Sequence, residues 1–330
     1  MFKRVRLFVY ISFGCLLAGG VFYAVWNFLP HGSLQQLMSA PSDPETNASD
    51  TGNTNEEKDA PEPSATLAET PLPDGYFQLI VKSHTTIKQA DASPVYDGDV
   101  ELKYAHQKTA GGILLTLYSM GLQLIQDGTL TENDLMTRDK MVQQNGDQKT
   151  VTPFDELSPE QQAMLMGAFA TNLCKITLDA NQNELGRQIL SEAGYAMIKE
   201  GNLNALRLMH GAYHHEADHW QDTKRIPMAM GFDLDCPLQF SRDVSQKNLI
   251  NITGSLSKDE VGSAQSDMVM KNVSFKLSGK ESFDETIGEY TSGEINLQYR
   301  FQVFQRNAQI ASLDGKISLS LNRVTTKITK

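Results

Sequence analysis

The sequence has little cysteine and no run of basic residues beyond its first six positions. Three cysteines among 330 residues are too few for a small fold held together by disulfides. The formal net charge is −11. That charge argues against a nucleic-acid-binding surface, because phosphate contacts need clustered Lys and Arg. We therefore expect no nucleic-acid partner.

The common catalytic signatures are also missing. The chain has no G-x-S-x-G, no phosphate-binding glycine loop and no C-x-x-C, so it lacks the usual marks of serine hydrolases, nucleotide-binding enzymes and thiol oxidoreductases. No motif present identifies a reaction. We therefore expect no cofactor, with zinc as the one exception considered below, and favour a protein that is not an enzyme.

The amino terminus has the pattern of a membrane anchor. Residues 1–6 include Lys3, Arg4 and Arg6, and residues 7–29 are almost entirely apolar. A helix of about 23 residues is roughly 34 Å long at 1.5 Å per residue, enough to cross a hydrocarbon core of about 30 Å. A cleaved signal peptide is the alternative, but its apolar core is normally shorter. The sequence predicts a cytoplasmic tail over 1–6 and an uncleaved transmembrane helix over 7–29.

An acidic, proline-rich segment follows. Residues 38–75 hold nine Asp and Glu and a single basic residue, Lys58. Such a composition buries too little apolar surface to offset its ordering entropy, which predicts a disordered linker over residues 30–75. By the positive-inside rule the N-terminus is cytoplasmic. We expect the C-terminal domain to be extracytoplasmic, either periplasmic or extracellular, with the membrane as partner through residues 7–29.

The remaining chain, residues 76–330, alternates apolar and polar residues with a period of two. This is the pattern of antiparallel strands with one face exposed to water. It predicts a mainly β domain: an antiparallel β-sandwich or a strongly curved sheet with one to three helices. Division into two β subdomains within 145–157 is the alternative. The alternating segments are Asp99–Tyr104, Asn172–Asp179, Phe232–Phe240, Asn272–Ser278, Glu294–Phe304 and Lys316–Asn322.

Turn and helix signals complete the pattern. Asp127-Gly128, Asn145-Gly146 and Asp314-Gly315 are typical hairpin turns. Ser158 followed by Pro159 predicts a helix start. We also expect helix over Glu184–Met197 and Leu203–His219, although both contain glycine.

Two cysteines fall on the apolar faces of predicted strands. If Cys174 and Cys236 paired, the disulfide would close a loop of about 60 residues and stabilise the fold by roughly 4 kcal/mol in the chain-entropy model. An oxidising compartment would permit that disulfide. The alternative, which we weigh equally, is that the two thiols are buried but do not form a disulfide.

The sharpest chemical motif is His215-Glu216-Ala217-Asp218-His219, which matches H-E-x-x-H. On a helix, His215 and His219 would share a face and ligate Zn²⁺, and Glu216 would act as general base on a bound water. The five letters resemble the zincin metallopeptidase signature. A non-catalytic metal site, and a polar connector with no ligand, are the other interpretations.

One segment, Ile113–Ile125, is apolar on both faces over much of its length. We interpret it as a strand covered on both sides or a strand–helix junction; lining an apolar ligand cavity is the alternative.

Together these features favour a single-pass, membrane-anchored protein whose exported β-rich domain is a binding or structural module. A zinc-dependent hydrolase that uses residues 215–219 and an envelope carrier of an apolar ligand are the two alternatives.

Overall fold

The computed structural model describes residues 71–88, 92–145, 147–178, 184–192, 217–227, 232–263 and 267–325. The predicted cytoplasmic tail, transmembrane helix and most of the predicted linker lie outside these ranges. In the part of the chain that is described, no helix has the length and apolar character needed to cross a membrane.

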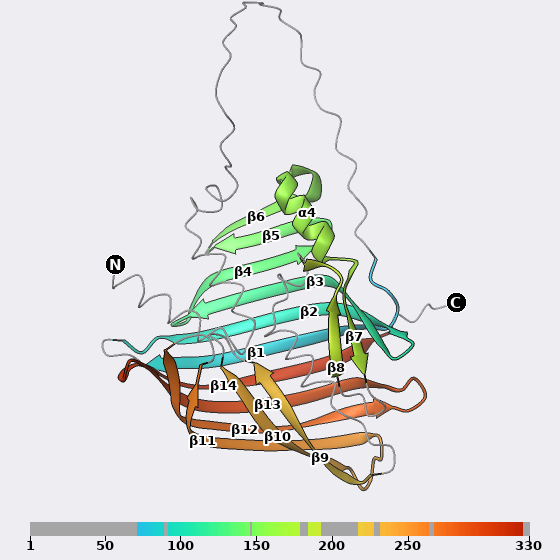
Figure 1. The fold of residues 1–330 in the computed structure, drawn as a ribbon. Helices are drawn as coiled ribbons and strands as arrows, with labels where there is room; N and C mark the ends of the chain where they lie inside the picture. Colours follow the sequence, from blue (N-terminus) through green and yellow to red (C-terminus); the bar gives the residue numbers. More distant parts are fainter. Residues whose placement is uncertain are drawn as a thin grey trace, which may run out of the picture.

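All described strands belong to one sheet (Figure 1). Its order is β6-β5-β4-β3-β2-β1-β14-β13-β12-β11-β10-β9, so the first and last of the described strands pair at its centre. The strands of the first half are β1 (Tyr76–Lys88), β2 (Val95–Thr109), β3 (Gly112–Gln126), β4 (Thr129–Thr137), β5 (Lys140–Asn145), β6 (Gln148–Pro153), β7 (Thr171–Leu178) and β8 (Glu184–Ile189). Those of the second half are β9 (His219–Pro227), β10 (Asp233–Arg242), β11 (Leu249–Gly262), β12 (Met268–Asp284), β13 (Glu289–Gln305) and β14 (Ala308–Val324).

The predicted mainly β, antiparallel fold with a helix is confirmed. Every ladder between named strands is antiparallel, and the described residues contain one α-helix, α4 (Pro159–Ala168), and a short 3-10 turn, η1 (Phe154–Glu156). The predicted β-sandwich is not observed, because the described strands make one sheet rather than two. Its curvature is visible in one contact: the Lys108 ammonium on β2 reaches the Ile287 carbonyl in the β12–β13 turn, although β1 and β14 lie between β2 and β13.

The period-two pattern correctly predicted which side chains point inward. The apolar positions of β2, β10, β12, β13 and β14 are buried, while the polar positions between them are exposed or half-buried. One apolar face therefore runs across neighbouring strands and forms the hydrophobic core, joined by Leu165 and Ala168 of α4. The buried positions that the pattern predicted include Val100, Leu102, Tyr104, Leu234, Cys236, Leu238, Val273, Phe275, Leu277, Ile295, Leu297, Phe301, Ile317, Leu319 and Leu321.

A β-bulge explains why β3 is apolar on both faces. The register between β2 and β3 shifts at Tyr118: Leu117 pairs with Tyr104, and Ser119 pairs with Lys103. An extra residue reverses the parity of the strand. Before the bulge the odd positions Leu115 and Leu117 are buried, whereas after it the even positions are buried, namely Met120, Leu122 and Leu124. Apolar residues at odd positions before the bulge and at even positions after it therefore all point to the same side of β3, toward the core.

The sheet also branches at this bulge. One edge of β3 pairs with β7 over Gly112–Thr116 and with β4 over Ser119–Gln126. The hairpin β7–β8 therefore leaves the main sheet, and it runs steeply across the direction of β3 in Figure 1. Helix α4 comes just before β7, and Phe169, which follows the helix, bridges to Leu117.

The turn predictions had mixed outcomes. Asp127 and Gly128 both have positive φ (49° and 79°) and connect β3 to β4, which confirms a tight hairpin. Asp314-Gly315 is wrong as a turn, because it lies inside β14. The physical reason is packing: a Cβ on Gly315 would lie 2.5 Å from the Tyr299 hydroxyl, so the glycine makes room for a ring. The third predicted turn, Asn145-Gly146, stays a prediction because Gly146 lies outside the described residues.

The helix predictions were right at one place and wrong at another. Ser158 caps α4 by accepting the Gln161 backbone N–H at 3.3 Å, and the Gln161 side chain accepts the Ser158 N–H at 3.0 Å, a full capping box with Pro159 at the first position. By contrast, the start of the predicted helix Glu184–Met197 is strand β8, because it pairs with β7. Most of the predicted helix Leu203–His219 lies outside the described residues, and its last residue begins β9.

Candidate functional site

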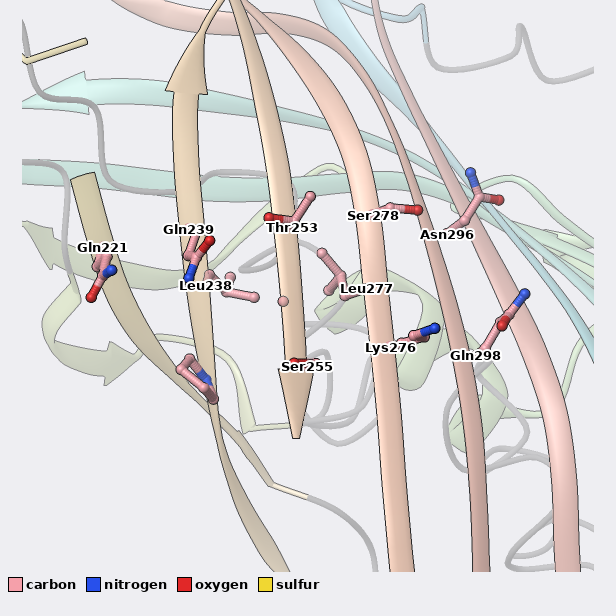
Figure 2. Close-up of a pocket in the computed structure, with 12 residues that line it drawn as sticks. Gln221, Leu238, Gln239, Thr253, Ser255, Lys276, Leu277, Ser278, Asn296 and Gln298 are labelled. Carbon is pink, nitrogen blue, oxygen red and sulfur yellow. The ribbon is translucent and has the colours of Figure 1, made fainter. Parts of the chain in front are cut away.

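The polar face of the sheet carries a hollow over β9 to β13. Its volume is about 440 Å³. Gln221, Gln239, Thr253, Ser278 and Asn296 lie in register on five adjacent strands. Figure 2 shows the row crossing these strands. We call this the neutral hollow; it is lined by Gln221, Pro237, Leu238, Gln239, Thr253, Gly254, Ser255, Lys276, Leu277, Ser278, Asn296 and Gln298.

Gly254, in the floor of the neutral hollow, lacks a side chain on the core side of the sheet. Gly254 pairs with Leu238 on one side and with Leu277 on the other. A Cβ at Gly254 would lie 2.6 Å from Leu238 Cδ2 and 2.9 Å from the Pro237 carbonyl oxygen. Because that space is already filled by Leu238, position 254 accepts only glycine without local movement.

A second hollow of about 520 Å³ continues along the same face over β12, β13, β14 and β1. It shares Lys276 and Gln298 with the neutral hollow, so the two are joined at these residues. We call it the charged hollow, and the two together the strand-face groove. Its lining is His84, Thr86, Ser274, Lys276, Gln298, Tyr299, Arg300, Asp314, Gly315 and Lys316.

Two ion pairs lie in or beside the charged hollow. The Arg300 guanidinium donates to Asp314 Oδ2 from Nε at 2.7 Å and from a terminal nitrogen at 2.5 Å. His84 Nδ1 lies 2.6 Å from Asp97 Oδ1. These contacts are exposed to solvent, so each contributes little to stability. Their effect is to hold the charges in place along the rim.

An ionisable cluster with a largely buried histidine and glutamate lies at one end of the apolar face. His106 Nε2 and Lys108 Nζ on β2 each lie 3.8 Å from a carboxylate oxygen of Glu289 on β13. Burial raises the pKa of Glu289, opposed by the charge of Lys108. Burial also raises the pKa of Tyr104 well above its usual value, with Glu281 and Glu289 adding to the effect. The cluster joins the β12–β13 turn to β2 and so closes that end of the sheet.

A carboxyl pair lies on β4. Glu132 and Asp134 share a side-chain hydrogen bond, and Asp134 also accepts the Gln144 backbone N–H at 3.3 Å. Glu132 is 6% exposed, and burial, with the neighbouring Asp134 charge, raises the pKa of Glu132 to about 8. At neutral pH this pair therefore holds one proton.

The structure describes only part of the H-E-x-x-H motif. His219 is the first residue of strand β9 and is exposed, while His215 and Glu216 lie outside the described residues. Because Ala217 and Asp218 are not helical and His219 begins a strand, the predicted helix that would place His215 and His219 on one face is wrong at its carboxyl end. Zinc binding and catalysis by these residues stay a prediction. Within the described ranges, no cluster of three or more His, Cys, Asp or Glu is placed to hold a metal ion.

The two cysteines are in different parts of the sheet. Cys174 is in β7 and Cys236 is in β10; both are buried thiols in the structure. Burial raises the pKa of the Cys236 thiol, which makes it a poorer nucleophile at neutral pH. A disulfide between the two in an oxidising compartment stays a prediction.

Sequence reasoning did not single out the groove. Asn296, Gln298 and Arg300 were identifiable as the polar positions of an alternating strand, but that pattern is common to all exposed strand faces. What marks the site is the register that places Gln298 between Lys276 and Lys316. No local signal encodes that register.

No known protein family matches this chain, and no curated protein matches it in sequence. Among solved structures, lipovitellin is similar with a TM-score of 0.40 and 6% identity, over 78% of this chain and 26% of that one. OprB of Pseudomonas putida gives a TM-score of 0.22 and 8% identity, over 75% of this chain and 92% of that one. The match thus spans about a quarter of lipovitellin, and at these TM-scores neither likeness bears on function.

Proposed function

We propose that this chain is a membrane-tethered, non-catalytic binding module whose β-rich domain holds a glycan in the strand-face groove. The observation that carries the proposal is the joined pair of hollows, in which amide and hydroxyl side chains from consecutive strands face one concave surface. A concave surface with convergent polar groups is the usual form of a binding site.

The pairing of the strands favours recognition through side chains. Strands β12 and β13 pair with a neighbour on both sides along the groove, so their backbone groups there are already used in the ladders. An extended peptide binds most readily by adding to a free strand edge, and β12 and β13 offer none within the groove. A ligand that lies over β12 and β13 must therefore be bound by side chains.

The chemistry of those side chains suits a chain of sugar hydroxyls. Gln and Asn amides each donate and accept hydrogen bonds, and Ser and Thr hydroxyls do the same. Every sugar hydroxyl is also both donor and acceptor. Among the described residues, no side-chain hydrogen bond occupies Gln239, Thr253, Ser278 or Asn296, which leaves these groups available to a ligand.

The proposed position in the cell follows from the amino-terminal pattern: residues 1–6 in the cytoplasm, 7–29 across the membrane, and the domain from residue 76 outside. Alkaline carbonate extraction should leave the full chain in the membrane, and deletion of residues 7–29 should release it. Protease added to cells with an intact inner or plasma membrane, after any outer membrane has been permeabilised, should digest the domain. A domain that stays protected until the membrane is lysed would contradict the orientation.

The binding proposal is tested with the full chain in detergent micelles and four soluble polysaccharides: dextran, laminarin, alginate and polygalacturonate. We expect at least one to bind, and Ser255→Trp to abolish that binding by filling the neutral hollow. Ser257→Trp is the matched control, because Ser257 is exposed on the same strand, one repeat further along, and does not line the groove. Failure of all four to bind, or binding that survives Ser255→Trp, would overturn the proposal.

A further inference from the structure

Three polar side chains meet where the two hollows join. Lys276 on β12 pairs in register with Gln298 on β13, and Gln298 pairs with Lys316 on β14. All three are exposed on the same face and line the groove. The two lysines thus flank the glutamine from either side, at the centre of the groove.

The spacing allows both ammonium groups to reach one ligand group. Adjacent strands are about 4.8 Å apart, so the two lysine backbones are separated by about 10 Å. Each lysine side chain extends by several ångströms and carries a rotatable ammonium with three donors. Both ammoniums can therefore converge over Gln298, whose amide supplies further N–H donors.

Within the described ranges, no carboxylate balances the charges of these two lysines. Arg300 is paired with Asp314, and His84 with Asp97. Elsewhere on the sheet Lys82 pairs with Asp99. Among the described residues, no carboxylate lies within ion-pair distance of Lys276 or Lys316. In a chain of net charge −11, two lysines that line one hollow and have no carboxylate partner in the described part of the chain form a local positive site.

We propose that Lys276, Lys316 and Gln298 form a subsite for an anionic group, so that the ligand of the groove is an acidic glycan bearing carboxylate or sulfate groups. This inference rests on the proposed glycan function and adds the class of glycan. Charge-assisted hydrogen bonds from two ammoniums to one anion are roughly twice as strong as neutral ones. The neutral hollow then takes the hydroxyls of the neighbouring sugar units.

The test compares two probes with the same sugar backbone, one charged and one neutral: a hexamer of galacturonic acid and its fully methyl-esterified form. Binding to the full chain in detergent is measured by calorimetry at 20 mM and 300 mM NaCl. We expect the acid to bind at least tenfold more tightly than the ester at low salt. Because salt screens exposed charges, the difference should shrink at high salt.

Variants of the lysines test whether Lys276 and Lys316 produce the preference for the acid hexamer. Lys276→Gln combined with Lys316→Gln should lower the affinity for the acid to that for the ester. Lys280→Gln is the matched control, since Lys280 is exposed on the same strand and face as Lys276 but does not line the groove. It should leave the acid-to-ester ratio unchanged. Equal loss with Lys280→Gln would overturn the subsite, because it would indicate only general charge attraction.

The other outcomes separate the two proposals. If acid and ester bind equally and Ser255→Trp abolishes both, the anionic subsite is wrong and the glycan function stands. If neither hexamer binds and no polysaccharide binds, the glycan function fails and the subsite with it. If inorganic sulfate binds as tightly as the acid hexamer and Ser255→Trp has no effect on the hexamer, the site recognises a free anion, which overturns the inference that the ligand is a glycan.

Discussion

The hydroxyl of Tyr299 lies 2.5 Å from Oγ1 of Thr85, in a buried hydrogen bond between residues 214 positions apart. The two residues are on β13 and β1, and β14 runs between them. The tyrosine ring crosses β14 at Gly315, where no side chain intervenes. The contact ties the carboxyl-terminal strands to the first strand of the domain beneath the charged hollow.

We predict that the two hydroxyls of this pair stabilise the fold jointly. Thr85→Val or Tyr299→Phe alone should each lower the free energy of unfolding by about 1–2 kcal/mol, because each removes one partner of a buried bond. The double variant should cost clearly less than the sum of the two. Urea unfolding of the purified full chain in detergent measures all four proteins; strictly additive losses would show that the hydroxyls are not coupled.

Gly315→Ala should destabilise the sheet. A Cβ at this position would lie 2.5 Å from the Tyr299 hydroxyl and 2.7 Å from the His84 carbonyl oxygen. Overpacking of this kind typically costs about 1–3 kcal/mol. Gly262→Ala, on β11, is the control, since nothing lies within 4 Å of its added Cβ. Thermal unfolding should show a lower midpoint for Gly315→Ala alone, and similar midpoints for both variants would refute the packing argument.

The Glu132 carboxyl should make stability depend on pH. Its pKa is raised to about 8 in the folded protein, from an ordinary value near 4.3 in an unfolded chain. The folded state therefore binds more protons, so the stabilisation is complete below about pH 4 and is lost as the pH rises toward 8. We expect a loss of the order of 1–3 kcal/mol between pH 5 and pH 8, part of it shared with Asp134, whose pKa is also raised by burial.

Glu132→Gln checks this sign. The amide stays neutral at every pH, so the variant should have a flatter dependence of unfolding free energy on pH and should be the more stable protein at pH 8. Glu289, whose pKa is also raised, contributes a similar slope to both proteins and cancels in the comparison. Parallel pH profiles for the two proteins would mean that Glu132 does not carry the effect.

The cap of α4 provides a local test. Ser158→Ala removes the acceptor for the Gln161 backbone N–H and should cost about 1 kcal/mol. Ser158→Asp keeps an acceptor and should retain most of the stability. Hydrogen exchange of the amides in the first turn of α4 measures the change directly, and an unchanged exchange rate in Ser158→Ala would contradict it.

The groove shows where prediction from local patterns ends. The inward side chains of β13, Ile295, Leu297 and Phe301, were predictable because a period of two in polarity sorts a strand into two faces. The outward residues Asn296 and Gln298 followed from the same rule. Nothing in that rule, however, indicates which residue of β12 or β14 lies beside Gln298.

What the amino-acid order determined alone is the local structure: the strand faces, the Asp127-Gly128 turn and the capping box at Ser158. These depend on residues within a few positions of one another. Tertiary structure decided the rest. Side chains from distant segments determine the bulge at Tyr118, the continuation of β14 through Gly315, and the alignment of Lys276, Gln298 and Lys316. The reason is that strand register is set by the packing of a whole face rather than by any one strand.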